Sequence, residues 1–272
     1  MPKPLLPLLL LSFALTACAG SDERLASIAI SPAAEADRWE NFNRGVYRFN
    51  DRLDRALVSP VTRGYRTVVP TAPRRGIGNF YRLAREPTYA ANATLQGKPK
   101  GVLKAIGRVL VNSVLGLGLA DHATGMGLTR EPHDFGQTLA VWGVASGPYL
   151  YTPFLGPSTL RDTLGFLVDF AFDPADQLKY RTMTFEQRMV MLGIRGLDMR
   201  SGLMDQGEQL LMGAADPYAT TRAAWLQLRR YELFDGNPPL VAEDDWEDDW
   251  EDTPSPSPAP AAPATPAEEA QP

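Results

Sequence analysis

The central stretch of residues 135–160 carries no charged side chain, and it restricts most strongly how this chain can fold. A stretch of this length is long enough to cross a bilayer as a helix. Seven glycines and prolines interrupt it, however, and each interior proline costs a helix about 3 kcal/mol. Irregular backbone is not tolerated against lipid tails, so we expect the segment to be packed within protein or to line a cavity. A buried core with tight turns and a partly membrane-embedded body with kinked Gly/Pro segments both fit this pattern.

Helical periodicity dominates the rest of the chain. Apolar side chains recur at steps of three and four and predict one amphipathic helix that ends at Pro60; they are Trp39, Phe42, Val46, Phe49, Leu53 and Leu57. Further helices are predicted at residues 76–85, 99–115, 158–172, 184–213 and 216–232. Strand signals are few, and no internal repeat is present. The predicted fold class is therefore mainly α, a single body of amphipathic helices over residues 37–239.

The helix predicted at residues 99–115 has a basic stripe beside its apolar face. Lys100, Lys104 and Arg108 follow one another at intervals of four, which places them on one side of a helix. A basic stripe next to an apolar stripe suits a membrane interface, where cations meet lipid phosphates. An ordinary surface helix with a solvated basic edge is the equal alternative.

The first residues form a bacterial lipoprotein leader. Residues 1–17 combine a positive charge at Lys3, an apolar stretch at residues 5–15 and small residues before a cleavage point. The motif Leu-Thr-Ala-Cys ends at Cys18, the only cysteine of the chain, and matches the bacterial lipobox at every position. Cys18 is the predicted lipid attachment site, because several acyl chains on one residue give a lasting anchor. An ordinary secretory signal is the alternative. Residues 18–36 are small and polar and are predicted to be a tether.

Charge is unevenly distributed along the chain. Eight acids and no base lie between Glu243 and Asp252, and two more acids follow in the Pro- and Ala-rich stretch after them. Without those ten acids and the leader's Lys3, the net charge of −5 becomes +4 for residues 18–239. This excess is too small to indicate nucleic-acid binding but suits a surface near anionic lipid. Residues 240–272 are predicted to be a disordered tail, whose Trp246 and Trp250 are the only features suggesting a contact motif.

The sequence offers little catalytic chemistry. The two histidines, His122 and His133, lie eleven residues apart and do not form a metal-binding pair on a helix. The segment Gly143-Val144-Ala145-Ser146-Gly147 is one residue out of register with a nucleophile elbow, so a hydrolase using Ser146, His133 and Asp134 is a weak alternative. Neither standard glycine-rich phosphate loop is present. We therefore predict no enzyme, no metal and no cofactor.

Several short motifs occur in an order that identifies a family. They are Trp39-Glu40-Asn41-Phe42-Asn43-Arg44, Gly78-Asn79-Phe80, Glu86-Pro87, Leu95-Gln96-Gly97, Asn112-Ser113, Asp134-Phe135-Gly136-Gln137-Thr138-Leu139, Trp142-Gly143-Val144, Gly147-Pro148-Tyr149, Leu155-Gly156-Pro157-Ser158-Thr159-Leu160-Arg161-Asp162 and Asp216-Pro217-Tyr218. Together they cover about residues 37–232. Each block alone is weak, but the ordered set behind a lipobox resembles the MlaA (VacJ) lipoproteins.

The resemblance implies a ring-like helical body embedded in the inner leaflet of the outer membrane. Members of this family extract mislocalised phospholipid from the outer leaflet and pass it to a soluble periplasmic lipid carrier, which maintains lipid asymmetry. They work with trimeric porins. The resemblance implies neither catalysis nor a cofactor. A structural porin-associated lipoprotein that does not move lipid is the alternative from another class.

Within this frame the sequence suggests two functional elements. The basic stripe of Lys100, Lys104 and Arg108 is expected to contact lipid head groups. A glycine-rich segment is expected to form a loop that gates a polar pore, because glycine permits several backbone states; its residues are Gly116, Gly118, Asp121, His122, Gly125 and Gly127.

Overall fold

The computed structural model describes residue 25 and residues 29–239. The predicted leader, Cys18 and the acidic tail with its tryptophans lie outside these residues. The described part is mainly helical, as predicted, and its elements are α3 (Pro32–Glu35), α4 (Glu40–Leu53), the π-helical turn η2 (Asp54–Val58), α5 (Ser59–Val68), α6 (Thr71–Leu95), α7 (Pro99–Val114), α8 (His122–Gly125), α9 (Phe135–Val141), β1 (Tyr149–Thr152), β2 (Gly156–Thr159), α10 (Leu160–Phe172), α11 (Pro174–Thr182), α12 (Phe185–Leu211) and α13 (Pro217–Leu233).

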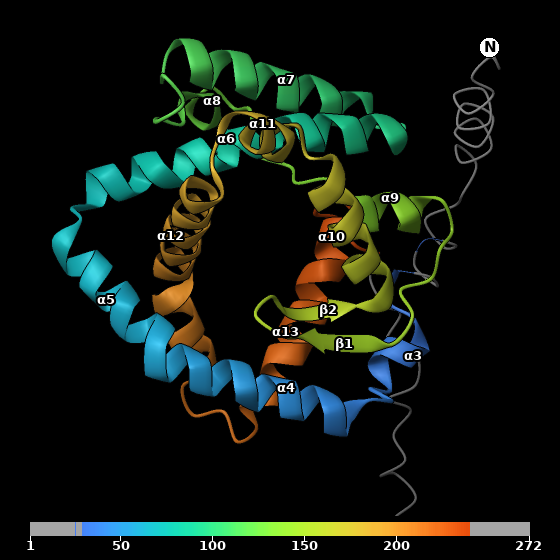
Figure 1. The fold of residues 1–272 in the computed structure, drawn as a ribbon. Coiled ribbons are helices and arrows are strands. Elements are labelled where there is room, and N and C mark those ends of the chain that lie inside the picture. Colours follow the sequence, from blue (N-terminus) through green and yellow to red (C-terminus); the bar gives the residue numbers. More distant parts are fainter. Residues whose placement is uncertain (1–24, 26–28, 240–272) are drawn as a thin grey trace, which may run out of the picture. The chain divides into compact units, whose positions relative to one another are not determined.

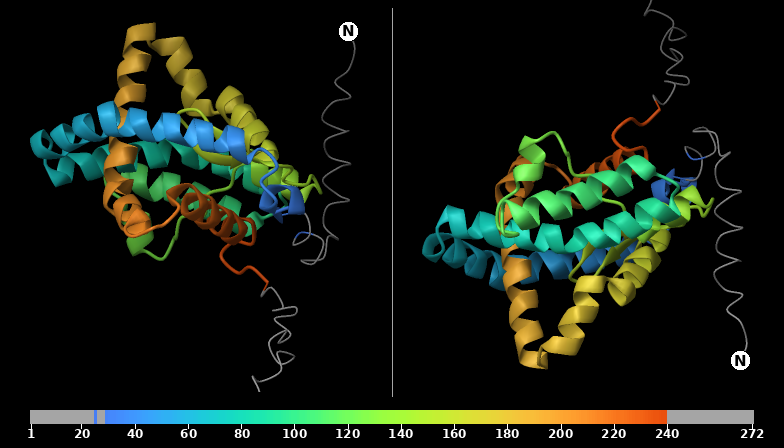
Figure 2. Two further views of the ribbon diagram at one scale, coloured as in Figure 1. Left: turned by 90° about the horizontal axis from the view of Figure 1, so that it is seen from below. Right: turned by 90° about the horizontal axis from the view of Figure 1, so that it is seen from above.

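The helices of the body are arranged as a ring. Helices α4, α5 and α6, then α10 and the β1–β2 hairpin, follow one another around a central region, and α12 closes it on the side of α5 (Figure 1). Helix α7 packs along the outside of α6, and α8 lies beside it. Seen edge-on, α11 and the first half of α12 project from one side of the ring, whereas α13 lies towards the other (Figure 2). We call this projection of α11 and the first half of α12 the arm.

The first long helix does not end at Pro60, and that prediction is wrong. Helix α4 passes through η2 directly into α5, and Pro60 lies in the first turn of α5. A proline ring clashes with the carbonyl four residues earlier in a regular α-helix. The π-helical turn lies directly before the proline, and in it the Ser59 N–H donates to the Asp54 carbonyl, five residues back. The chain therefore builds one continuous curved rod along this edge of the ring.

A second proline is also accommodated inside a helix. Helix α6 runs from Thr71 to Leu95, well beyond the predicted residues 76–85, and contains Pro87. One turn before the proline, the Arg130 guanidinium donates to the Arg82 carbonyl at 2.7 Å. The other predicted helices agree with the structure to within two residues at each end. The helix predicted to begin at residue 158 begins at Leu160, because residues 156–159 form β2.

The uncharged segment folds as α9 followed by the antiparallel β1–β2 hairpin, in which Tyr149 pairs with Thr159 and Thr152 with Gly156. Two asparagines of α4 bind the free edge of β1. The Asn43 amide donates to the Tyr149 carbonyl at 3.1 Å and accepts from the Tyr151 N–H at 2.8 Å. Two turns further along α4, the Asn50 amide donates to the Thr152 carbonyl and accepts from the Phe154 N–H just beyond β1. The kinked segment is thus packed within protein, where side-chain amides satisfy its open edge.

The body begins earlier than the sequence indicates. Residues 29–36, which the sequence assigns to the tether, include the short helix α3 and pack on the body. Ala29 and Ala34 are buried in two apolar clusters. The Ser31 N–H donates to Ser146 Oγ at 2.9 Å. Small residues suit a tether, but they also allow this close packing against the hairpin.

Helices α9 and α10 approach each other through two glycines. A Cβ placed on Gly165 of α10 would lie 2.3 Å from the Gly136 nitrogen and 2.6 Å from its Cα. These are backbone atoms and cannot turn aside as a flexible side chain can. The glycine at 165 is therefore required by the packing of the two helices.

We predict that Gly165→Ala destabilises the body by about 3 kcal/mol, because the added methyl group forces the two helix backbones apart. Gly193→Ala in α12 is the matched control: no atom lies within 4 Å of the place its methyl group would take, so alanine should stabilise the helix by about 0.5–1 kcal/mol. Chemical unfolding of both variants in the same detergent measures the two changes. Equal unfolding midpoints for the two variants would contradict the assigned packing.

Candidate functional site

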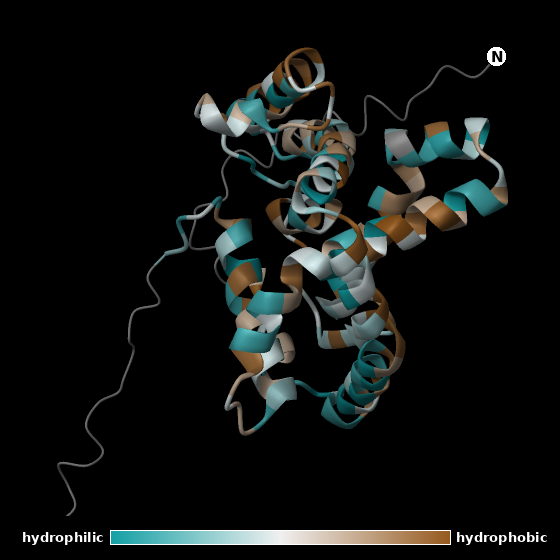
Figure 3. Cartoon of the chain, turned by 90° about the vertical axis from the view of Figure 1, so that its left-hand side faces the viewer, coloured by the Kyte–Doolittle hydropathy of each residue, from teal (hydrophilic) through white to brown (hydrophobic). Residues whose placement is uncertain are grey.

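The body has an inverted polarity. Among the described residues, 23 buried positions are polar or charged and only 11 are apolar, whereas 37 large apolar residues are exposed. Water-soluble domains show the reverse distribution, with charged residues almost never fully buried. Figure 3 shows hydrophobic residues interspersed with hydrophilic ones along the helices of the ring and the arm. Exposed apolar surface on this scale marks contact with a membrane or with partner proteins.

Helix α7 displays this inversion within one element. Its apolar residues Leu103, Leu110 and Val114 are 60–72% exposed, whereas Arg108 and Asn112 on the opposite face are buried. The polar face of this helix is directed into the protein, and the apolar face is left open. The same holds for α4, in which Asn43 binds the hairpin while its predicted apolar face remains largely exposed.

A buried network of charges replaces an apolar core between α6, α7 and α8. The Arg108 guanidinium donates to Glu86 at 2.8 Å and to Asp121 at 3.0 Å, and it also binds Thr124 and the Leu128 carbonyl. Burial alone would raise the pKa of the Asp121 carboxyl, but hydrogen bonds from Thr124, Arg108 and Asn112 hold that pKa well below its usual range. Asp121 is therefore ionised and fixed in place.

A second buried network joins α9, α10 and α13. The Arg229 guanidinium donates to Asp134 at 2.6 Å and to Asp162 at 2.8 Å, and a third carboxylate, that of Glu232, lies 3.1 Å away. Burial disfavours the charge on Arg229, but the neighbouring carboxylates outweigh this and raise the pKa of its guanidinium. Arg161 is also buried here, 3.2 Å from Asp162. These contacts connect α13 to α9 and α10, which precede it by more than 40 residues in the sequence.

Helix α12 closes the ring through polar contacts with η2 and α5. Arg200 forms a two-pronged ion pair with Asp54 at 2.7 and 2.9 Å, and Asp205 pairs with Arg66 at 2.8 Å. The hydrogen bonds from Arg200 lower the pKa of Asp54 against the opposing effect of its partial burial. The contact surface between α12 and the rest of the ring is thus polar as well.

The three residues of the predicted basic stripe lie in different environments. Arg108 is 2% exposed and fully engaged in the network above, so its position does not suit head-group binding. Lys104 pairs with Glu131 and is partly exposed, and Lys100 is exposed. Head-group contact stays a prediction for Lys100 and Lys104 only.

The glycine-rich segment lies on the outer side of α6 and α7. Leu117 and Gly118 adopt left-handed backbone conformations, with φ of 49° and 75°. The Gly118 N–H donates to the Asn112 carbonyl, and Asn79 of α6 donates to the Leu119 carbonyl at 2.9 Å. His122 is exposed at the start of α8. The segment is therefore tied to α6 and α7 at several points, and its gating role stays a prediction.

The residues considered for a hydrolase do not meet. Ser146 Oγ bonds to Ser31, Asp134 binds Arg229, and the ring nitrogens of His133 have no hydrogen-bond partner within the described part of the chain. Within residue 25 and residues 29–239 there is also no cluster of His, Asp or Glu side chains suited to a metal ion. No helix in the described ranges combines the length and the hydropathy needed to cross a membrane.

The charged residues that hold this interior together are not predicted from the sequence. Glu86 and Asp162 fall in motifs that identify the family, and Arg229 lies in an otherwise ordinary helix. Periodicity alone assigns a charged side chain to the solvent side of a helix. The available signal is the position of Asp162 on a helix whose other faces are mostly apolar, which leaves its charge in need of a partner.

Comparison with known proteins gives a consistent result. A family model described as MlaA lipoprotein matches residues 35–232. The intermembrane phospholipid transport system lipoprotein MlaA of Escherichia coli (strain K12) is 35% identical over 207 residues, which is 74% of this chain and 80% of that protein. The protein of the same name from Haemophilus influenzae is 29% identical over 86% of this chain and 92% of its own.

A solved structure has the same architecture. It was reported as the structural basis for maintenance of bacterial outer membrane lipid asymmetry, and it aligns with a TM-score of 0.62 at 35% identity. The alignment covers 72% of this chain and 98% of that one. Nearly the whole of that structure therefore aligns with the helical ring described above.

We predict that Asp121→Asn destabilises the body by about 2 kcal/mol, because the amide turns an N–H₂ group towards Arg108 and leaves part of a buried charge unpaired. Asp51→Asn is the control, since Asp51 pairs with Arg55 on the surface and its loss should cost less than about 0.5 kcal/mol. Equilibrium unfolding of both variants measures the difference.

The pH dependence should follow the same group. Because the pKa of Asp121 is lowered by folding, its contribution is present above the unfolded value of about 4 and is lost as the pH falls towards the folded value. Wild-type stability should thus fall more steeply than that of Asp121→Asn on acidification. Parallel curves would rule out the assigned role of Asp121.

Proposed function

The chain belongs to the MlaA lipoprotein family, and on that premise we propose that it acts as an outer-membrane lipoprotein in intermembrane phospholipid transport and so maintains the lipid asymmetry of the outer membrane. The relatives named above carry this function in their names. The inverted polarity of the ring is the observation on this chain that supports it most directly.

The inverted polarity suits a body that lies among lipids. In a lipid environment apolar side chains gain nothing from clustering inside, and polar contacts between helices hold a structure together. We propose that the exposed apolar faces of α4, α7 and α10 contact acyl chains in the inner leaflet. The polar inner faces would then give phospholipid head groups a path through the ring, while the tails stay in the apolar layer.

Two kinds of protein partner follow from this proposal. An outer-membrane trimeric porin would hold the ring at a fixed depth through part of its exposed apolar surface. A soluble periplasmic lipid carrier would receive the phospholipid that the ring extracts from the outer leaflet. The transfer requires neither a cofactor nor a chemical step in the chain, and we propose that the protein is not an enzyme. The predicted attachment of lipid to Cys18 would confine the protein to the periplasmic side.

The proposal predicts a lipid phenotype in cells. In a strain lacking this gene, surface-exposed phospholipid should rise, and the full-length gene should reverse the rise, because the protein removes such lipid. Labelling of outer-leaflet phospholipid with a reagent that does not cross the membrane measures the effect. Unchanged surface phospholipid in the deletion strain would reject transport and favour the structural, porin-associated alternative.

Embedding in the leaflet predicts a second outcome, which is independent of transport. The Cys18→Ser variant cannot be acylated, yet its purified body should still need detergent to stay in solution, because the exposed apolar surface remains. Sedimentation after detergent removal, in comparison with the acylated protein, measures this. A monodisperse body in plain buffer would mean that the lipid on Cys18 is the only membrane connection.

A further inference from the structure

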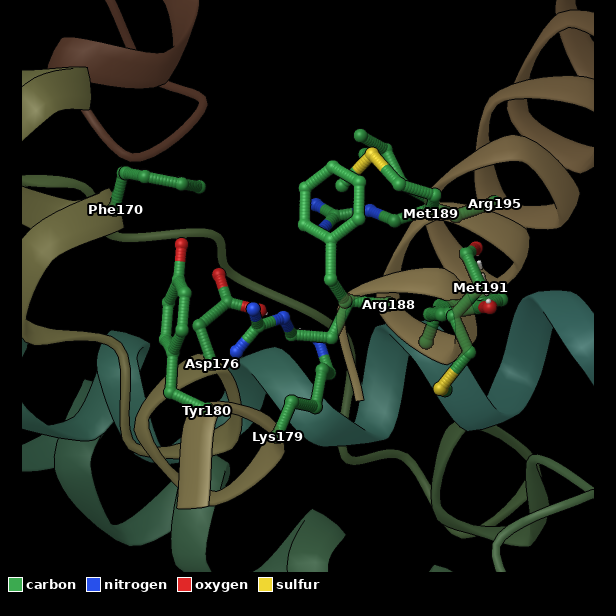
Figure 4. Close-up of a pocket in the computed structure, with 11 residues that line it drawn as sticks. Phe170, Asp176, Lys179, Tyr180, Arg188, Met189, Met191 and Arg195 are labelled. Carbon is green, nitrogen blue, oxygen red and sulfur yellow. Dashed lines mark hydrogen bonds and ion pairs between the residues drawn. The ribbon is translucent and has the colours of Figure 1, made fainter. Parts of the chain in front are cut away.

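A pocket lies where the arm joins the ring, between α6, α10, α11 and α12. Its sides are formed by Tyr81 of α6, Phe170 of α10 and residues of both arm helices (Figure 4). The Tyr81 hydroxyl donates to the Met191 carbonyl at 2.8 Å, which fixes α12 against α6 at this point. The pocket is thus built from four elements and is held in shape by a bond across it.

The pocket holds more positive than negative charge. Three cations, Lys179, Arg188 and Arg195, line it together with a single carboxylate, that of Asp176, so its formal charge is +2. Asp176 already pairs with Lys179 at 2.5 Å. Figure 4 shows these two side chains gathered with Arg188 beside the ring of Tyr180.

Among the residues that the structure describes, the two arginines of the pocket lack the carboxylate partner that Arg44, Arg108 and Arg229 have. Within the described residues, neither Arg188 nor Arg195 has a carboxylate at ion-pair distance, whereas Arg200 further along the same helix is paired with Asp54 at 2.7 Å. Arg188 instead lies 4.6 Å above the ring of Tyr180, which orients its guanidinium without neutralising it. Both guanidinium groups therefore have donors available for an anion.

The remaining wall of the pocket is apolar and open at its edge. Phe170, Tyr180, Phe185 and Leu192 are each 50–61% exposed, so the apolar lining continues into the exposed apolar surface of the arm. The cavity has a volume of about 150 Å³, below the roughly 300–1,000 Å³ of pockets that enclose a drug-sized ligand. It can take only one end of a phospholipid, with the rest lying along the open wall.

We propose that this pocket binds the phosphate of a single phospholipid, with Arg188 and Arg195 donating to the phosphate oxygens and the acyl chains resting against Phe170, Tyr180 and Phe185. Arginine is suited to this role because its planar fork donates two parallel hydrogen bonds to a phosphate. The assignment rests on the proposed function and deepens it, because it places a binding position on the transport path. It adds a head-group contact on the arm to the one predicted for Lys100 and Lys104 of α7.

The test uses the full-length acylated protein in its own membrane. Phe185 is replaced by the photoreactive residue p-benzoylphenylalanine, and cross-linking to phosphorus-32-labelled phospholipid is measured after illumination. Adding Arg188→Gln and Arg195→Gln together should reduce the cross-linked lipid about tenfold, because two charge-assisted hydrogen bonds are lost. Arg181→Gln is the matched control: it removes the same charge from an exposed position on α11 outside the pocket.

Equal losses in the control and the double variant would overturn the proposal, since the arm's overall charge would then be responsible. Thermal unfolding in detergent shows whether the double variant keeps the fold. If it does not, Arg195→Lys with Arg188→Lys retains the charge but removes the forked donors. This pair should bind less lipid than wild type, and unchanged cross-linking would count against the assigned contacts.

Competition in detergent identifies the part of the ligand that is recognised. Unlabelled phosphatidylglycerol added before illumination should displace the labelled lipid and so reduce cross-linking, whereas diacylglycerol, which lacks the phosphate, should do so at least about tenfold less well. Displacement by diacylglycerol at equal concentration would show a tail site and overturn the assignment. Displacement by millimolar inorganic phosphate alone would show a site for free anions rather than for lipid, and would also overturn it.

Failure of this inference differs visibly from failure of the proposed function. If the wild-type gene restores lipid asymmetry but cross-linking at residue 185 ignores both arginines, transport stands and the pocket assignment falls. If the wild-type gene does not restore asymmetry, the proposed function falls. Restored asymmetry together with arginine-dependent cross-linking supports both.

Discussion

The buried pairing of arginines with carboxylates is the constraint on which the rest of this structure depends. Arg229 is held by Asp134 and Asp162, and Arg108 by Glu86 and Asp121, in positions where a soluble protein would place leucines. In water such pairs add little net stability compared with apolar packing, but removing one partner is costly because the other charge is left buried. These pairs therefore favour the one arrangement of helices in which every buried charge meets its partner.

This choice of interior explains the outer surface. A body that buries many of its polar groups in internal contacts leaves many large apolar residues on the outside, and α7 shows both sides of this division within one helix. It also explains the hairpin in the uncharged segment. Glycines and prolines cannot form a helix there, and Asn43 and Asn50 satisfy the backbone that results. Side-chain amides thus satisfy the open edge of the hairpin, as a neighbouring strand does in a larger sheet. Guanidinium groups and their carboxylates occupy the interior, where soluble proteins place an apolar core.

The sequence predicts the helical class and most helix positions, because periodicity is a local property. The cost of proline in a helix predicts that the uncharged segment is kinked, but it leaves open whether that segment is packed within protein or lines a cavity. The sequence does not predict how the helix continues past Pro60, because a π-helical turn is rare and has no signal in the apolar periodicity. It misplaces Arg108 for another reason. A basic residue beside an apolar stripe has the same spacing whether it faces solvent or Glu86, and only the fold decides between the two. The same applies to residues 29–36, whose small side chains suit both a tether and a tight contact.

Helix α12 connects the structural and functional uses of arginine in this protein. In its second half, Arg200 is neutralised by Asp54, and the helix closes the ring. In its first half, Arg188 and Arg195 lie in a pocket with a single carboxylate that is already paired with Lys179. A charge without a partner in a partly closed apolar site is unfavourable unless a ligand supplies the counter-charge. The second half of the helix is therefore stabilised by its own ion pair, whereas the arm is stabilised most when an anion is bound. In a protein whose interior is held by ion pairs, two arginines that line one pocket without a carboxylate at ion-pair distance among the described residues are a natural place for an anionic ligand.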